Sequence, residues 1–294
     1  MIRYPWNEKA VEQAISLISP KWLGGATERT DALIRLGRYE ERSSSWSKVK
    51  PVYMKLQHNK CAYCEQQMEG GAYGPIEWDL EHFRPKSDVE PWPNAKRHPE
   101  ITYDIPLGDA SQTGYYWLAY DVHNYAASCK VCNTIFKLNF FPTLNDRAQV
   151  PQSDENLIRE GALLCFPLGE RDEDPENLIT FTLTTAVPKY QSGPENLRAR
   201  VIIDFFGLNR RDHLHKQRAQ MIGAVGALLA ERDRDEASDI LLAELANMER
   251  SYIPHAACVR AFIRLWQTDV RIAKLGYMQC RRYGFDPELA PPTL

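Results

Sequence analysis

Two short cysteine motifs, Cys61-Ala-Tyr-Cys64 and Cys129-Lys-Val-Cys132, bracket the stretch of sequence that decides the fold. Four thiolates in two such pairs are typical of a tetrahedral structural zinc site, in which no coordination position is left open for chemistry. A single pair could be coincidence or a redox motif, but two pairs with the other cysteines unclustered favour metal. We therefore expect the zinc to brace the irregular chain between the pairs, and any reaction to take place beside it.

The run Trp78-Asp79-Leu80-Glu81-His82-Phe83-Arg84-Pro85-Lys86 lies between the two cysteine pairs and carries candidates for phosphodiester chemistry. We expect a short strand that ends at His82. Hydrolysis needs a base to activate water, a cation to stabilise the phosphate, and positive charge to hold the backbone. The imidazole of His82 suits the first role and the carboxylate of Glu81 suits binding of the cation. Asp79 is a rival carboxylate, because residues two apart share one face of a strand.

Asn133 follows the second cysteine pair directly. An amide oxygen together with the carboxylate of Glu81 favours magnesium or manganese over a second zinc. The sequence therefore predicts two metal sites of different chemistry, a structural zinc and a catalytic divalent ion.

The composition is ordinary for a globular protein of 294 residues, with 44% hydrophobic and 26% charged residues. A net charge of -3 excludes a globally basic nucleic-acid-binding protein, so any such surface has to be local. The sequence shows no signal peptide and no apolar run of about 18 residues that could span a membrane. Of seven cysteines, Cys165, Cys258 and Cys280 are unpaired by spacing, which is consistent with reduced thiols and a cytoplasmic protein.

The patterns predict an α+β protein in which a zinc-braced core is embedded in mainly helical chain. We expect a helical N-terminal arm (1–58), the core (59–145), and a small β element followed by a C-terminal helical bundle (146–294). Apolar spacing and caps predict the helices 7–20, 27–36 (or 30–36), 46–57, 195–207, 212–232, 236–251 and 255–282. Residues 162–166 and 179–185 are expected to be strands, and the proline-rich 85–106 a loop.

Two basic clusters in the C-terminal half allow two interpretations. If 255–282 is one helix, Arg260, Arg264, Arg271 and Lys274 form a stripe opposite an apolar face. A second cluster covers 210–218. Each is either a solvated face or a groove for phosphate or an acidic partner.

Residues 61–142 hold a series of motifs that match a known family. They are Cys61-x-x-Cys64-Glu65, Glu81-His82-Phe83-Arg84-Pro85-Lys86, Tyr116-Trp117-Leu118-Ala119-Tyr120, Asn124, Cys129-x-x-Cys132-Asn133, Lys137 and Phe141-Pro142. This series resembles HNH endonucleases, and most closely the HNH proteins of bacterial anti-phage systems of the Septu and retron-associated type. A looser match continues into Phe206-Gly207-Leu208-Asn209-Arg210.

The resemblance implies a ββα-metal core with His82 as the general base and Glu81, where many relatives have aspartate, as a ligand of the catalytic ion. Asn124 would be the central asparagine that braces the loop between the strands. Asn133 would bind the ion where many relatives have histidine. Tyr125 departs from the commoner leucine, and His123 beside it could join the site.

The same resemblance implies a role in anti-phage defence beside an ATPase of the SMC or ABC type, with cleavage that leaves a 5′-phosphate. Arg84, Lys86 and Lys137 are the expected substrate contacts. Two alternatives stay open at this point. One is an RNA nuclease, for example one acting on tRNA, since such a site contacts phosphates rather than bases. The other is a zinc-stabilised adaptor without catalysis.

Overall fold

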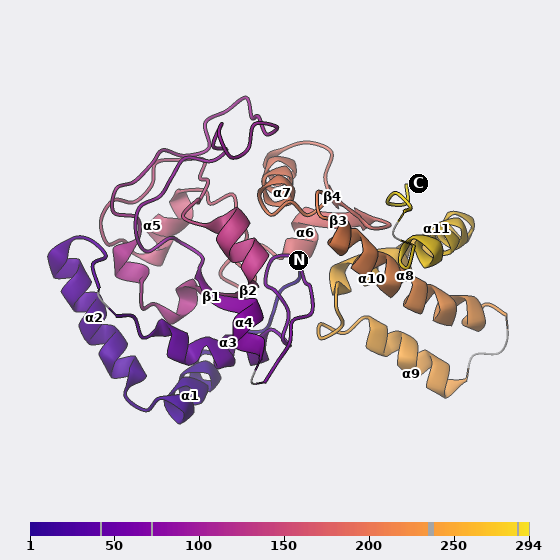
Figure 1. The fold of residues 1–294 in the computed structure, drawn as a ribbon, viewed down its shortest axis with the longest axis horizontal. Helices are drawn as coiled ribbons and strands as arrows, with labels where there is room; N and C mark the ends of the chain where they lie inside the picture. The colour runs from indigo at the N-terminus through magenta and orange to yellow at the C-terminus, as the bar shows by residue number, and fades with distance from the viewer. Residues whose placement is uncertain (42, 72, 235–237, 287, 294) are drawn as a thin grey trace. The chain divides into compact units, whose positions relative to one another are not determined.

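The fold, seen in a computed structural model, combines helices with two separate two-stranded sheets (Figure 1). The structure describes residues 1–41, 43–71, 73–234, 238–286 and 288–293. It is therefore of mixed α+β class, as expected. The chain forms two compact units, which we call the pocket unit (5–59 and 68–172) and the helical unit (1–4, 60–67 and 173–294). No helix in the described part of the chain is long and apolar enough to cross a membrane.

The pocket unit begins with two helices whose ends follow from local chemistry. Helix α1 (Glu8–Ile18) starts where the Asn7 side chain accepts a hydrogen bond from the Ala10 amide at 3.0 Å. Helix α2 (Trp22–Leu36) ends at Gly37, which has a φ of 73°. The expected start of α2 near residue 27 is wrong, because burial of Trp22 extends the helix toward its N-terminus.

An antiparallel pair of strands forms the centre of the pocket unit. Strand β1 (Trp78–His82) pairs antiparallel with β2 (Tyr125–Cys129). The two strands lie beside helix α3 (Lys50–Leu56) in Figure 1, and the buried Gln57 side chain bonds to both backbone groups of Ala127 at 2.8 Å. The remaining elements of this unit are η1 (Trp46–Val49), α4 (Gly74–Glu77), η2 (Tyr116–Leu118), η3 (Val122–Asn124), η4 (Val131–Lys137) and α5 (Asp154–Arg159).

The long connection between β1 and β2 is irregular, and residues 85–106 form a loop as expected. It folds back on itself where the Tyr115 amide donates to the Pro85 carbonyl at 2.8 Å. Gly114 makes this return possible, because it has a φ of 56° and a Cβ there would lie 1.5 Å from the Ser87 oxygen. The turn therefore depends on glycine at this position.

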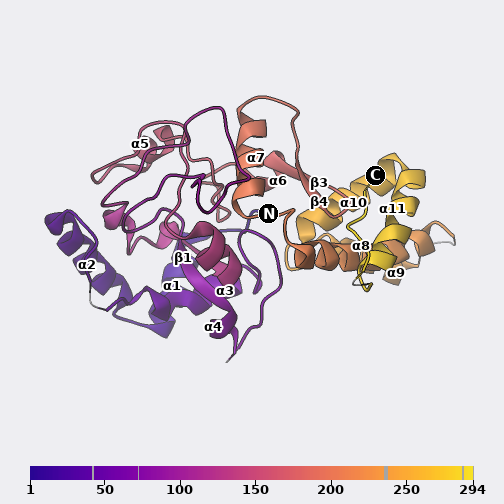
Figure 2. The same ribbon diagram turned by 45° about the horizontal axis from the view of Figure 1, so that its top comes forward.

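The helical unit packs its longest helices around one apolar core. Helices α8, α10 and α11 lie against one another in both views (Figures 1 and 2), and Leu183 of the β3–β4 turn joins their core. The elements of the unit are α6 (Pro175–Leu178), β3 (Ile179–Thr182), β4 (Thr185–Pro188), α7 (Pro194–Phe205), α8 (Asp212–Arg232), α9 (Asp239–Met248), α10 (Ala256–Thr268) and α11 (Val270–Tyr283).

The predicted single helix over 255–282 is wrong. It breaks at Asp269, whose φ and ψ are −144° and 86° and whose side chain caps α11 by accepting from the Ile272 amide at 2.9 Å. The four cations therefore lie on two helices and form no continuous stripe. Arg260 pairs with Glu176, and Lys274 lies 3.4 Å from Asp233. These pairs favour a structural role for half of the proposed stripe.

Other expectations for the C-terminal half also need correction. Residues 162–166 form no strand; Ala162 makes only an isolated bridge with Thr143. In the basic cluster, Arg218 is buried and donates to the carbonyls of Thr184 and Leu208, so it is unavailable to a partner. Residues 236 and 237 of the expected helix 236–251 lie outside the described residues.

Two glycine substitutions should separate steric crowding from backbone strain. Gly114→Ala should lower the free energy of unfolding by about 3 kcal/mol or more, because overpacking adds to the left-handed backbone cost. Gly37→Ala, with a similar φ but no atom within 4 Å of its Cβ, should cost only about 1–2 kcal/mol. Urea unfolding of both variants measures this difference. Equal losses would contradict the close approach of Gly114 to Ser87.

Candidate active site

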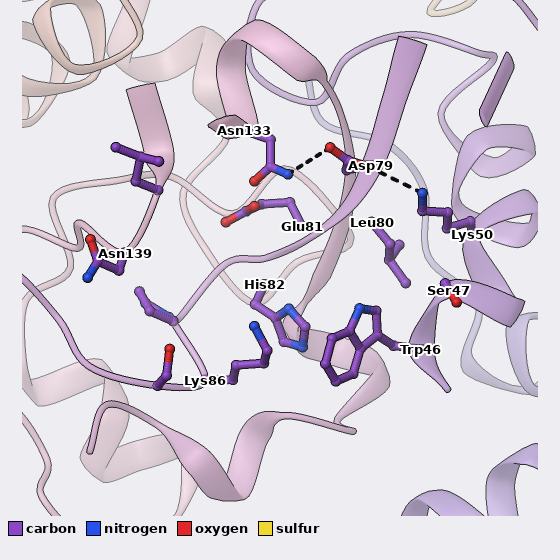
Figure 3. A pocket seen from close by; sticks show the side chains of 13 residues that line it. Trp46, Ser47, Lys50, Asp79, Leu80, Glu81, His82, Lys86, Asn133 and Asn139 are labelled. Carbon is purple, nitrogen blue, oxygen red and sulfur yellow. Dashed lines mark hydrogen bonds and ion pairs between the residues drawn. The ribbon is translucent and has the colours of Figure 1, made fainter. Parts of the chain in front are cut away.

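A polar cavity of about 470 Å³ lies in the pocket unit beside β1 (Figure 3). Strand β1 supplies its acidic and imidazole groups, and η1 and η4 contribute walls on either side. The described residues that line it are Trp46, Ser47, Lys50, Asp79, Leu80, Glu81, His82, Pro85, Lys86, Ser87, Asn133, Leu138 and Asn139. Most of the residues expected to act chemically therefore meet in one place.

Glu81 is a buried carboxylate with a single close cation. The residue is 5% exposed, and Lys137 Nζ lies 3.3 Å from Glu81 Oε1. Burial raises the pKa of Glu81 to about 7, against the opposing effect of Lys137. Lys137 is wholly buried, and burial lowers the pKa of its ammonium. Glu81 is thus an oxygen donor whose only close positive partner in the described chain is the buried Lys137, which is not among the described residues that line the cavity.

His82 is held in a defined tautomer. Its Nε2 lies 3.0 Å from the Ala119 carbonyl oxygen, which can only accept, so Nε2 carries the proton and Nδ1 carries the lone pair. The rings of Trp46 and Tyr125 pack edge-on against the imidazole, with centroids 4.9 and 5.1 Å away. Burial, and then the charge of Lys86, lower the pKa of His82 to about 3. The imidazole is therefore neutral near pH 7, and its Nδ1 is able to accept a proton.

Asn133 and Asp79 form a fixed pair. The Asn133 Nδ2 donates to Asp79 Oδ2 at 3.0 Å, while Asp79 Oδ1 accepts from Lys130 at 2.6 Å and from Lys50 at 3.3 Å. Burial raises the pKa of Asp79, but the hydrogen bonds from Lys130 and Asn133 hold it below the ordinary value. Figure 3 shows the Asn133 amide oxygen turned toward the Glu81 carboxylate. Asp79 thus orients the amide, and its own oxygens are both occupied.

Lys86 extends into the cavity beside His82 (Figure 3). Its ammonium lies 5.0 Å from the centre of the Trp46 ring and 5.1 Å from that of Tyr39. Burial lowers its pKa, and among the described residues it forms no ion pair with a carboxylate. Lys86 is therefore a cation that an incoming anion can reach.

Besides the buried Lys137, three expected site residues lie outside the described lining of this cavity. Asn124 Oδ1 accepts from the Arg84 amide at 2.8 Å, and its Nδ2 donates to the carbonyls of Arg84 and Leu118. The Arg84 side chain packs over Phe141 and bonds to Glu160 at 3.5 Å. His123 lies between Glu8 and Asp121.

The four cysteines of the two Cys-x-x-Cys motifs come together. The sulfur atoms of Cys61, Cys64, Cys129 and Cys132 all lie within 4.8 Å of one another, and all four residues are buried. Each pair is held by its own turn: the Glu65 amide donates to the Cys61 carbonyl at 3.1 Å, and the Cys132 amide approaches the Cys129 sulfur at 3.4 Å. Four buried thiols at this spacing can hold a zinc ion.

Trp46, Lys50 and Asn139 line the cavity but were not predicted from the sequence. Lys50 and Asn139 stand in no motif. Trp46 is a signal that could have been noticed, because a large aromatic residue in the run Ser43-Ser44-Ser45-Trp46-Ser47 is out of place on a purely solvated segment.

Sequence comparison finds a relative of this chain. The Septu protein PtuB of Bacillus mycoides (strain KBAB4) is 30% identical over 175 residues, which is 59% of this chain and 50% of that protein. This chain thus spans about half the length of the relative it matches. No family model matches the sequence, and no solved structure matches it.

Removal of one cysteine of this group of four should abolish zinc binding. We expect about one zinc per chain in the wild-type protein and almost none in Cys132→Ser, which should also unfold at lower temperature because structural zinc contributes folding free energy. Cys280→Ser changes a buried thiol outside the group and should keep its zinc. Elemental analysis measures both. Folded wild-type protein with less than a few tenths of a zinc per chain would exclude the site.

Proposed function

We propose that this protein is a metal-dependent HNH endonuclease that hydrolyses phosphodiester bonds of DNA. The observation that carries the proposal is the meeting of Glu81, the neutral imidazole of His82 and the Asn133 amide in one polar cavity. A carboxylate, an amide oxygen and a base within one cavity are the groups that such hydrolysis requires. A zinc-stabilised adaptor would need only the cysteines.

His82 acts as the general base in this proposal. Its Nδ1 takes a proton from the attacking water, while Ala119 holds the protonated Nε2 and so fixes the ring. Lys86 holds the phosphate beside the imidazole. Asn124 ties the two ends of the connection between β1 and β2, and acts on the site through the backbone of Arg84.

Glu81 and Asn133 are the residues that would hold the catalytic ion. Their donor set consists of oxygen, which fits magnesium or manganese and differs from the thiolate set of the cysteines. When bound, such an ion supplies positive charge that stabilises the phosphate in the transition state. Lys137 keeps the Glu81 carboxylate in place from the buried side.

The motifs of residues 61–142 and the similarity to the Septu protein PtuB support a role in anti-phage defence. We propose that the nuclease is an effector that works in the cytoplasm with an ATPase of the SMC or ABC type. Purified protein, incubated with DNA and with total RNA in magnesium, tests the activity and separates the two substrates. Absence of cleavage of both, with and without that ATPase, would remove the proposal.

His82→Ala should reduce cleavage by about 10²–10⁴-fold, because the general base is lost. Its zinc content and melting temperature should stay close to those of the wild-type protein. His123→Ala is the matched control, since it removes a histidine outside the described lining of the cavity, and its rate should be unchanged. If His82→Ala cleaves at the wild-type rate and His123→Ala loses cleavage, the general base is His123 instead.

Asp79→Ala should weaken manganese binding by roughly 10–100-fold, because the Asn133 amide loses the partner that orients it. Electron paramagnetic resonance of manganese titrations measures this without substrate. Asp154→Ala removes an exposed carboxylate of the same unit and should leave the affinity unchanged. If Asp79→Ala binds manganese like the wild-type protein, Asp79 does not position the ligand.

A further inference from the structure

The reacting groups of the cavity lie below its rim. Glu81 is 5% exposed and His82 is 7% exposed. Trp46 and Lys86 stand beside the imidazole. A phosphate therefore has to enter the cavity before Nδ1 of His82 can act on a water molecule next to it.

This depth separates two forms of nucleic acid. An intact duplex is a stiff rod, with a persistence length of about 50 nm, and carries its phosphates on the outside of paired strands. An unpaired strand can turn one phosphate inward and splay its base to the side, at little cost in pairing or stacking.

Trp46 and Tyr39 provide a surface for such a base. Both rings are half-buried, and the Lys86 ammonium lies about equally far from the two, at 5.0 and 5.1 Å. Aromatic rings combined with a cation are the means by which proteins hold single strands without reading sequence. The same Trp46 ring lies 4.9 Å from His82, so a base on this surface would bring its phosphate near the imidazole.

The other cation of the described lining, Lys50, is paired with Asp79. Two cations outside that lining are also paired: Lys130 with Asp79 and Lys137 with Glu81. Lys86 is thus the cation in the described lining that an incoming phosphate would meet first. From this arrangement we infer that the cavity takes unpaired nucleotides, with Trp46 as the stacking residue. This rests on the proposed nuclease function, since it names the form of its substrate.

Binding of labelled oligonucleotides, measured by fluorescence anisotropy without magnesium or manganese, tests the inference apart from catalysis. Wild-type protein should bind a single strand at least about tenfold more tightly than the same sequence as a duplex, which corresponds to one stacked base. Trp46→Ala should weaken single-strand binding by about 5–150-fold and leave duplex binding unchanged. Trp46→Phe keeps a π face and should lose much less. Tyr73→Ala, an exposed aromatic residue outside the described lining, is the matched control.

Duplex binding as tight as single-strand binding would overturn the inference. A folded, zinc-containing Trp46→Ala that binds the single strand as tightly as the wild-type protein would also overturn it. If Trp46→Ala does not fold, Trp46→Leu fills the space without a π face and takes its place. A single-stranded RNA arm shows which unpaired polymer is preferred, and preference for either over duplex supports the inference. If single-strand binding depends on Trp46 but no nucleic acid is cleaved, the proposed nuclease function is wrong and the inference about unpaired nucleotides stands. If duplex is cleaved faster than single strands, the nuclease function stands and this inference is wrong.

Discussion

The antiparallel register of β1 against β2 is the constraint on which the pocket depends. It sets Glu81 opposite Ala126 and His82 opposite Tyr125. A slip of one residue would turn every side chain of β1 to the other face of the pair. Gln57 fixes β2 through both backbone groups of Ala127, and Tyr125 packs against the His82 ring. Packing from outside the strands thus enforces a register that two short strands alone would hold weakly.

Two groups of paired charges surround the cavity, one buried and one nearer the surface. Glu81 and Lys137 form a buried pair, while Asp79 gathers Lys50 and Lys130 nearer the surface. A buried pair of this kind contributes little net stability, because desolvation offsets most of the attraction between the two charges. Replacing a buried ion pair by apolar residues of similar volume is often neutral or stabilising. The cost is more easily understood if Glu81 is needed as a charged oxygen donor, which supports the proposed ion site.

Local patterns in the sequence predicted the elements whose chemistry is local. The Asn7 cap, the end of α2 at Gly37 and the cysteine knuckles each involve residues within a few positions of one another. Prediction failed where distant residues decide, as at Trp22, whose burial extends α2 beyond its expected start. It also missed one local signal. The helix 255–282 breaks at Asp269 because capping of α11 competes with continuation, and a helical wheel drawn across that break has no physical meaning.

The candidate site divides in the same way. Glu81, His82 and Asn133 could be named as candidates from sequence because each stands in a short motif of its own. Asp79 and Lys137 are held by partners 50 or more positions away in the sequence. Asn133 and Lys130 bind Asp79, and Glu81 binds Lys137. Trp46 reaches His82 from a segment that no motif connects to it.

The irregular chain between β1 and β2 explains why these partners have to be so specific. Without a continuous strand ladder, several of its backbone groups bond to side chains: Asn94 accepts from the Lys96 amide, Ser111 from the Gly114 amide, and Asn124 bonds to both backbone groups of Arg84. Such bonds fix single points rather than a periodic structure. The wall of the cavity that carries Lys86 is therefore positioned by a few polar side chains, and the loss of one of them would shift the cation relative to His82 while the strands stayed in place.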